Sequence, residues 1–256
     1  QSEAVLREQT VQDRLEWQYR YTQASKYYSK TSVTELKRLR EHADNDEAQE
    51  ENDIHAGTLA SSVESAHRYQ TTLLRRPKFM EQQAMNAAEQ GTVYHSVMQH
   101  IPIGSSVDVE VVVQTLLHLV QQQVITDEQR AVVRPDIISE FFCTDMGRRL
   151  LCAIQVQREI PFSYGIPVEE LHPDADREIG REIVLIQGVI DCLFEEEDGL
   201  VLLDFKTDAV QGKPDVVAER YRIQIDLYAK AIEAITSKKV KEKVLYFFDG
   251  SYLINM

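Results

Sequence analysis

The sequence has few cysteines, no long hydrophobic run and no excess of basic residues. Cys143, Cys152 and Cys192 are an odd set without CxxC spacing, which fits neither a disulfide framework nor a zinc or iron–sulfur site. We expect buried, inert thiols in a reducing compartment. No apolar run approaches the length of a membrane span, and the N-terminus lacks the basic-then-apolar layout of a signal peptide. We therefore expect no membrane association.

Basic charge is also scarce, because 42 acidic and 28 basic side chains give a formal net charge of −14. A protein that captures nucleic acid by itself normally carries a basic surface. Residues 41–53 contain seven carboxylates and no Lys or Arg, a composition typical of a disordered, solvated linker. If the substrate is a nucleic acid, we expect another component to deliver it.

The most informative stretch has two strand-like runs that flank Asp198-Gly199. This dipeptide favours a tight hairpin turn, and a turn there places Asp191 opposite Lys206. Side chains alternate along a strand, so Asp191, Asp204 and Lys206 are predicted to share one face. Burying two carboxylates and an ammonium together is costly unless a cation lies between the carboxylates. The hairpin therefore predicts a metal site.

A simpler interpretation of this hairpin is a solvated ion pair, because an Asp-x-Lys sequence at a strand end is common. Asp191 argues against it. This residue directly follows the run 183–190, which otherwise predicts a buried strand, and a carboxylate there is poorly explained as a surface group.

A helix predicted over residues 82–101 supplies another candidate. Gly91 lies four residues before His95, so the two are neighbours on one helix face. Glycine costs about 1 kcal/mol in a helix interior, which suggests close approach by another part of the chain or a ligand. From this helix alone, a satisfied core histidine is the favoured interpretation of His95.

The rest of the chain gives an order of elements. The pattern is helical from 107 to about 151, with a capping box at Thr126 and Gln129. Strands begin at Ile154, and Pro161 predicts an edge strand or a strand end. After the hairpin, residues 218–234 form an amphipathic helix, followed by a final strand from Lys243.

The N-terminal part differs in composition. Residues 3–20 can form a helix, and Ser32 with Glu35 has capping-box spacing for a second, short helix. Because the first residue is not Met, we expect a fragment of a longer polypeptide. We divide the chain into a helical extension (1–40), an acidic linker (41–56), and a main domain (57–256) with a helical lobe at about 107–151.

Five motifs occur together in the main domain: Gly91-Thr-Val-Tyr-His95, Arg158-Glu-Ile-Pro-Phe162, Gly188-Val-Ile-Asp191, Asp204-Phe-Lys206-Thr207 and Gln224-Ile-Asp-Leu-Tyr228. In this order they resemble the RecB-like branch of the PD-(D/E)xK nuclease superfamily, over roughly residues 85–250. Segments 15–21, 32–37 and 76–79 also resemble the approach to AddA-type nuclease domains of bacterial AddAB helicase-nucleases. The resemblance implies an α/β (α+β) fold with a restriction-endonuclease-like core (αβββαβ), a helical insertion and an N-terminal helical extension.

The resemblance also assigns roles by position. The implied catalytic residues are Asp191, Asp204 and Lys206. The implied metal ligands are His95, Asp191, Asp204 and the main-chain carbonyl of Phe205. Supporting or DNA-positioning roles fall on Gln224, Tyr228, Glu159 and Thr207. A polar helix face packed on the sheet explains Gln224 and Tyr228 equally well, and an edge-strand carboxylate is the alternative for Glu159.

The implied activity is Mg²⁺- or Mn²⁺-dependent hydrolysis of DNA by an exonuclease, because oxygen ligands with one imidazole suit these ions. The substrate would be a single-stranded end, delivered by a helicase motor in the same full-length polypeptide, with an AddB-type partner subunit. The setting would be double-strand break processing and recombinational repair in the bacterial cytoplasm.

Two cofactors are not expected. Some relatives hold an iron–sulfur cluster on four cysteines, and this chain has three, wrongly placed. It also has no GxxxxGK loop, so we expect no ATP site. The alternative function is a catalytically silent DNA-binding or subunit-docking module on the same fold, against which the retained Asp191, Asp204 and Lys206 argue.

Overall fold

The structure, a computed structural model, describes residues 24–39, 85–104 and 106–256. The expected helix at 3–20 and the acidic linker at 41–56 lie outside these residues. Contacts divide the chain into two units: a smaller unit of residues 1–31 and 164–186, and a larger unit of residues 32–163 and 187–256. The two longest strands, β2 and β3, contribute residues to both.

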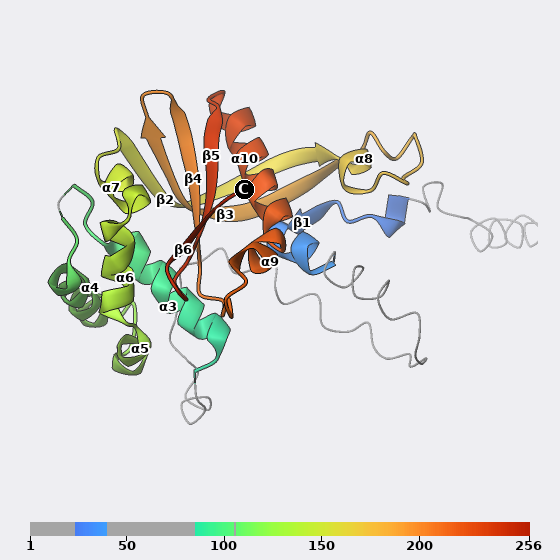
Figure 1. Ribbon diagram of the computed structural model, residues 1–256. Helices are drawn as coiled ribbons and strands as arrows, with labels where there is room; N and C mark the ends of the chain where they lie inside the picture. The colour runs from blue at the N-terminus through green and yellow to red at the C-terminus, as the bar shows by residue number, and fades with distance from the viewer. Residues whose placement is uncertain (1–23, 40–84, 105) are drawn as a thin grey trace, which may run out of the picture. The chain divides into compact units, whose positions relative to one another are not determined.

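The larger unit is built on a mixed β-sheet (Figure 1). Its strands are β2 (Gln155–Pro167), β3 (Ile183–Glu196), β4 (Gly199–Lys206), β5 (Val240–Phe247) and β6 (Tyr252–Asn255). Strand β4 pairs antiparallel with β3 and parallel with β5, β6 is antiparallel to β5, and β2 pairs with β3. The apolar run in β4 fits its central position, where both faces of the strand are covered.

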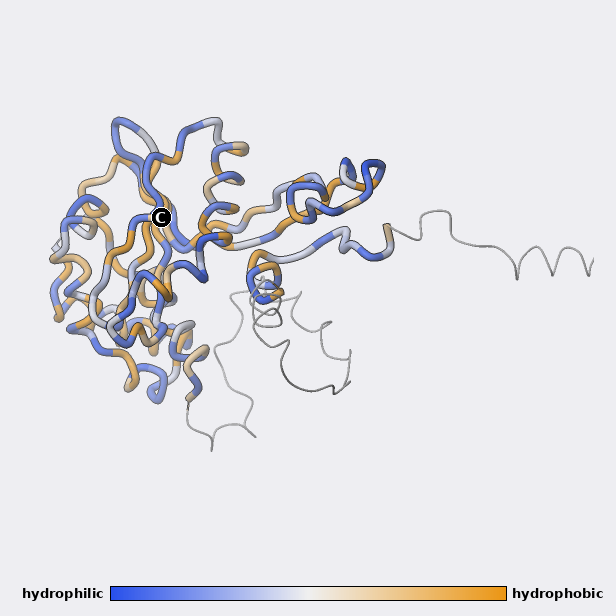
Figure 2. Tube along the Cα trace, turned by 45° about the vertical axis from the view of Figure 1, so that its right-hand side comes forward, coloured by the Kyte–Doolittle hydropathy of each residue, from blue (hydrophilic) through white to orange (hydrophobic). Residues whose placement is uncertain are grey.

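Helices cover both faces of this sheet. They are α3 (Ala87–His100), α4 (Val109–Gln121), α5 (Asp127–Val132), α6 (Pro135–Cys143), α7 (Asp145–Leu151), α9 (Pro214–Glu219) and α10 (Arg222–Thr236). Helices α3, α4, α6 and α7 share a hydrophobic core with Val201, Leu203 and Phe205 of β4. Helix α10 packs on β5. Figure 2 shows hydrophobic segments in the strands and in the helices around them.

Several local predictions are confirmed. Helices α4 to α7 lie in the stretch expected to be helical. Thr126 and Gln129 form the capping box at the start of α5. A short helix at residues 33–39 begins after Ser32, whose Oγ accepts a hydrogen bond from the amide of Glu35 at 3.1 Å. Each of these features depends on a few neighbouring residues.

The predicted hairpin register was wrong by two residues. Glu196 pairs with Gly199, so the turn falls on Glu197 and Asp198. Gly199 is needed instead for close packing, because a Cβ there would lie 3.1 Å from the carbonyl oxygen of Lys239. Its φ of +148° also favours glycine. A shift of two leaves every side chain on its predicted face, since the alternation has a period of two.

Other boundaries also differ from expectation. Of the two alternatives for Pro161, the edge strand is confirmed: β2 pairs with β3 off the main order of strands and continues six residues past the proline, which an edge strand tolerates. The single helix expected at 218–234 is two helices, α9 and α10, separated by Arg220 and Tyr221. Strand β6 was not anticipated.

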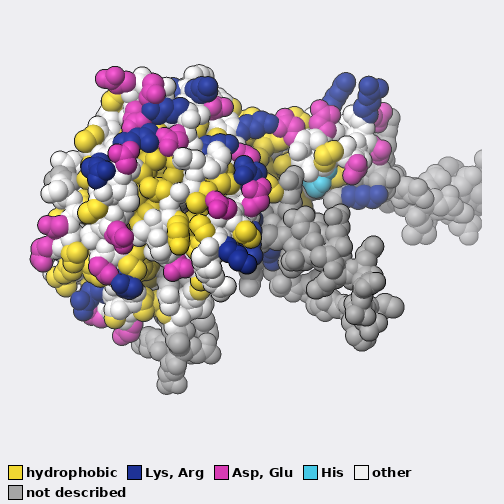
Figure 3. All heavy atoms as spheres, in the orientation of Figure 1, with side chains coloured by type: hydrophobic (Ala, Val, Ile, Leu, Met, Phe, Trp, Pro, Cys, Tyr) yellow, Lys and Arg dark blue, Asp and Glu magenta, His cyan; other side chains and the backbone are white. Residues whose placement is uncertain are grey.

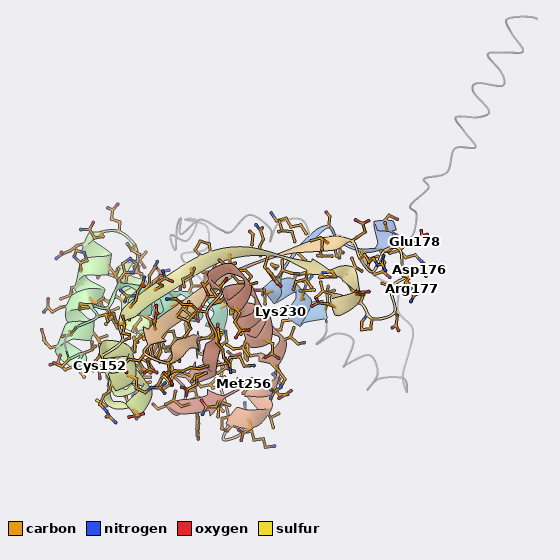
Figure 4. The ribbon with its side chains drawn as sticks, turned by 90° about the horizontal axis from the view of Figure 1, so that it is seen from above. Cys152, Asp176, Arg177, Glu178, Lys230 and Met256 are labelled. Carbon is orange, nitrogen blue, oxygen red and sulfur yellow. The ribbon has the colours of Figure 1, made fainter. Side chains whose placement is uncertain are left out.

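The smaller unit contains η1 (Ala24–Lys26), α8 (Val168–Leu171), most of β1 (Lys30–Ser32) and the adjoining ends of β2 and β3. The amide of Leu185 donates to the carbonyl of Ser29 at 3.0 Å. A charged loop between α8 and β3 carries the labelled residues Asp176, Arg177 and Glu178 (Figure 4).

The expectation of three buried thiols was wrong for two of them. Cys192 is buried in the sheet, and burial raises its pKa to about 12. Cys143 and Cys152 are exposed, because each lies at the surface end of a helix (Cys152 is labelled in Figure 4). Among the described residues, no helix is both long and apolar enough to cross a bilayer.

Candidate active site

The end of β4 carries a buried ion pair. Lys206 Nζ lies 2.5 Å from Asp204 Oδ2, and the Asp204 side chain is only 1% exposed. Asp204 Oδ1 accepts a hydrogen bond from Gln224 Nε2 of α10 at 3.2 Å, whereas the buried Oδ2 faces the Lys206 ammonium. Each oxygen of this buried carboxylate therefore lies beside a polar or charged nitrogen.

Asp191 joins this group from β3. Its Oδ2 accepts a hydrogen bond from the Phe205 amide at 2.8 Å, which ties the two strands together between Asp204 and Lys206. The same oxygen lies 3.3 Å from His95 Nδ1. The structure therefore brings together the two aspartates and the lysine of the hairpin, and adds His95.

His95 reaches the site because α3 passes close to the end of β4. A Cβ on Gly91 would lie 2.9 Å from Thr207 Oγ1, so only glycine allows this approach without a shift of the threonine. One helical turn later, His95 lies on the same helix face. The close approach that the helix sequence suggested is made by Thr207.

Glu159 reaches the same place through an unusual backbone conformation. Its φ is +52°, a left-handed value that is rare for a non-glycine residue and is often found at functional sites. Neighbouring strand residues normally point to opposite faces. Here both contact α3: Arg158 Nη1 donates to the carbonyls of Met98 and Ile101 at 2.9 and 2.6 Å, and Glu159 Oε1 lies 4.0 Å from His95 Nδ1.

Gln224 and Tyr228 lie one turn apart on α10. Gln224 Nε2 is 3.3 Å from the Tyr228 hydroxyl as well as bonded to Asp204. The Tyr228 ring meets the Phe162 ring edge-on, with ring centroids 5.5 Å apart. Gly188 leaves room for both rings, because a Cβ there would lie 2.6 Å from a Phe162 ring carbon and 3.0 Å from one of Tyr228.

Comparison with known proteins decides the family. The model of the PD-(D/E)XK nuclease superfamily matches residues 56–253. The chain belongs to this superfamily. It is 38% identical over 258 residues to an ATP-dependent helicase/nuclease subunit of Bacillus cereus strain G9842, and 40% identical over 255 residues to the corresponding subunit of Bacillus licheniformis.

These alignments cover 98% and 96% of the chain but only 20% of each relative, so the chain spans about a fifth of their length. Among solved structures, the crystal structure of SSO0001 aligns over 99% of this chain and 75% of its own, at 11% identity and a TM-score of 0.33. That similarity is too weak to bear on the fold. All five motifs lie within the stretch that matches the nuclease superfamily.

Burial makes the carboxyls of this nuclease-family site unequal. Burial and repulsion from Asp191 raise the pKa of Glu159 to about 7, and the same two causes raise the pKa of Asp204 to about 6 despite Lys206. Burial also acts on Asp191, but His95, Lys206 and the Phe205 amide outweigh it and lower its pKa. Asp191 is therefore the most strongly anionic of the three.

For the two basic side chains of the site, burial acts in the opposite direction and favours the lower pKa. Burial alone would lower the pKa of His95, but Asp191 outweighs it and the pKa is raised. Burial likewise opposes the charge of Lys206, and Asp204 and Asp191 outweigh it, so its pKa is also raised. In the metal-free site the neighbouring aspartates therefore favour the protonated forms of both His95 and Lys206.

The donor set fits a divalent cation. One ligand atom each from His95, Glu159 and Asp191 lies within 4.8 Å of the others, and two carboxylates with one imidazole suit Mg²⁺ or Mn²⁺. The resemblance implies His95 and Asp191 of this set as ligands, together with Asp204, which here pairs with Lys206, and the main-chain carbonyl of Phe205. Glu159, predicted only as a supporting residue, belongs to the converging group. Nothing in the neighbouring sequence predicts the left-handed φ of Glu159.

Two further residues near the site received no role from sequence. The Tyr221 hydroxyl donates to Asp208 Oδ2 at 2.8 Å, and Lys206 Nζ lies 4.5 Å from the centre of its ring. Arg158, as described above, joins β2 to the last turn of α3. The sequence shows Arg158 only as part of a motif and Tyr221 only as part of a helical pattern. Their contacts join segments that are distant in sequence, so sequence alone does not predict them.

Proposed function

We propose that the chain is the nuclease domain of a helicase-nuclease and hydrolyses phosphodiester bonds of single-stranded DNA with a bound Mg²⁺ or Mn²⁺. The observation that carries this proposal is the cluster of Asp191, Asp204, Lys206, His95 and Glu159 at one end of the β3–β4 hairpin. Because the chain belongs to a nuclease superfamily, we interpret this cluster as a site of phosphodiester hydrolysis.

Each side chain has a distinct task in this proposal. A divalent ion held by His95, Glu159 and Asp191, with Asp204 next to them, would polarise a phosphodiester oxygen and acidify a bound water. Lys206, held in place by Asp204, would orient the attacking water or stabilise the charge that develops on the phosphate. Gln224 and Tyr228 would hold Asp204 and position the strand.

Delivery of the strand by a motor would compensate for the charge of the domain. The net charge is −14, and on the face seen in Figure 3 acidic and basic side chains are interspersed, not gathered into a basic surface. The relatives are named helicase/nuclease subunits. We therefore propose a motor in a longer polypeptide, an AddB-type partner, an exonucleolytic role in cytoplasmic double-strand break repair, and no iron–sulfur cluster or ATP site in this chain.

The test is cleavage of single-stranded DNA by the 256-residue chain, with Mg²⁺ or with EDTA. Asp204→Asn and Lys206→Ala should each lower the rate by at least about 100-fold, because Lys206 would contact the reacting phosphate and Asp204 holds Lys206 in place. Asp198→Asn is the matched control, since Asp198 is 74% exposed at the other end of the same hairpin. Circular dichroism and thermal unfolding establish that each variant is folded.

Metal-dependent cleavage that survives in folded Asp204→Asn or Lys206→Ala would contradict the assignment of these residues. Absence of cleavage by the parent chain in both Mg²⁺ and Mn²⁺, even when the motor region is restored, would favour the silent DNA-binding or docking module instead.

A further inference from the structure

The proposed catalytic lysine has a second partner besides the carboxylate of its ion pair. Lys206 Nζ lies 2.5 Å from Asp204 Oδ2 and 4.5 Å from the centre of the Tyr221 ring. An aromatic face attracts a cation, and the attraction is stronger where water is excluded. The Lys206 side chain is only 11% exposed. A carboxylate and an aromatic ring therefore both restrain this ammonium.

The Tyr221 ring is itself fixed in place. The residue is 7% exposed, and its hydroxyl donates to Asp208 Oδ2 in the loop that follows Lys206. The ring also packs on Phe247 of β5, with ring centroids 6.3 Å apart, and Phe247 pairs with Lys206 across the two strands. The ring is thus anchored on both sides of the lysine that it contacts, in the loop and in the neighbouring strand.

The break between α9 and α10 gives Tyr221 this position. Its amide donates to the carbonyl of Ala218 in α9 at 2.8 Å, and its own carbonyl accepts from the amide of Ile225 in α10 at 3.0 Å. Tyr221 therefore follows one helix and is the N-cap residue of the next. Backbone hydrogen bonds to both helices hold the residue at the end of the catalytic strand.

The start of α10 supports both members of the ion pair. Gln224 lies three residues after Tyr221, and residues at this spacing are neighbours on a helix. Gln224 Nε2 donates to Asp204 Oδ1 at 3.2 Å, whereas the Tyr221 ring contacts Lys206. One short segment thus holds the carboxylate through an amide and the ammonium through a ring.

A second lysine contacts the same ring. Lys37 Nζ lies 3.5 Å from the ring centre, and it belongs to the short helix at residues 33–39. A ring that served only to attach this helix would have no effect on Lys206. Substitution of Lys37 separates the two roles.

We propose that Tyr221 is a positioning residue of the nuclease site, whose ring holds the Lys206 ammonium where it can reach the reacting phosphate. This inference rests on the proposed function, because it takes Lys206 as the catalytic lysine. The motifs of the sequence include Gln224 and Tyr228 of this helix, and Tyr221 lies outside them. The role assigned to Tyr221 follows from the contacts described above.

The test compares variants that differ in the ring face. Tyr221→Leu removes the ring and should lower the single-turnover rate of cleavage of single-stranded DNA about tenfold, with the affinity for the DNA unchanged. Tyr221→Phe keeps the ring and should retain the rate within about threefold. A trifluorinated phenylalanine at the same position keeps the size of the ring but withdraws electrons from its face, so it should behave as Tyr221→Leu does. Circular dichroism establishes that each variant is folded.

A second measurement needs neither metal nor substrate. In the metal-free chain with isotope-labelled lysine, NMR relaxation gives the order parameter of the Lys206 ε-carbon. Its signal is assigned by its loss in Lys206→Ala. The order parameter should fall in Tyr221→Leu and in the fluorinated variant, and stay unchanged in Tyr221→Phe. Lys37→Met is the matched control, because it removes the other lysine at the ring and should change neither the rate nor the order parameter of Lys206.

Three results would overturn the inference. Equal rates for Tyr221→Phe and the fluorinated variant would mean that the ring acts by its shape alone. An unchanged order parameter of Lys206 in folded Tyr221→Leu would mean that Asp204 holds the lysine without help. A loss of rate in Lys37→Met equal to that in Tyr221→Leu would mean that the ring acts through the N-terminal helix. Failure of the proposed function appears differently, as absence of metal-dependent cleavage in the parent chain.

Discussion

Replacement of Glu159 by glutamine should change how the stability of the metal-free chain depends on pH. Burial and Asp191 raise the pKa of Glu159 from an ordinary 4.5 to about 7. At a pH below 4.5 the carboxyl is protonated in both the folded and the unfolded state. Between 4.5 and 7 the unfolded state ionises first, so the free energy of unfolding falls as pH rises and levels off above 7.

The magnitude follows from the same two values. A change of pKa from 4.5 to about 7 corresponds to about 3 kcal/mol of stability lost on ionisation. Glu159 is 24% exposed, so water screens the charge only in part. Glu159→Gln keeps the shape and does not titrate. The variant should therefore gain about 3 kcal/mol over the parent between about pH 4.5 and about pH 8.

The assay is urea denaturation of both proteins in EDTA at several pH values between about 5 and about 8. Glu197→Gln, in the exposed hairpin turn, controls for the loss of one charge from an acidic chain. A difference between Glu159→Gln and the parent that stays constant over this range would refute the argument from burial. With Mg²⁺ added, the parent should become more stable than Glu159→Gln, because the ion stabilises the ionised carboxylate of the parent.

Other substitutions test how the site is supported. Arg158→Ala removes the donor to two carbonyls at the end of α3 and should lower the free energy of unfolding by about 1–3 kcal/mol. Because His95 lies on the same helix, the affinity for Mn²⁺ measured by calorimetry should also fall by at least about tenfold. An unchanged affinity would contradict this. Gly188→Ala should destabilise the chain by about 1–3 kcal/mol, because its Cβ meets the packed Phe162 ring at 2.6 Å. Gly91→Ala should cost less, since its Cβ meets only a rotatable threonine hydroxyl and alanine favours the helix; equal costs at both glycines would show that packing does not decide the difference.

Local patterns in the sequence were enough to predict that the charged residues of the hairpin lie together. Alternation along two strands placed Asp191, Asp204 and Lys206 on one face, and an error of two in the register did no harm because the alternation has that period. The capping box at Thr126 was also readable, because it depends on four consecutive residues. Order and spacing of the five motifs indicated the superfamily that the family comparison then confirmed.

Tertiary structure alone decided the rest of the site. The sequence of α3 left the role of His95 open, and the position of this residue depends on the approach of Gly91 to Thr207. Glu159 enters the cluster through a left-handed φ that its own sequence does not favour. Periodicity and capping act between near neighbours, so a sequence states them directly. Contacts between distant segments depend on how all the packed elements close together, and only the folded chain specifies that.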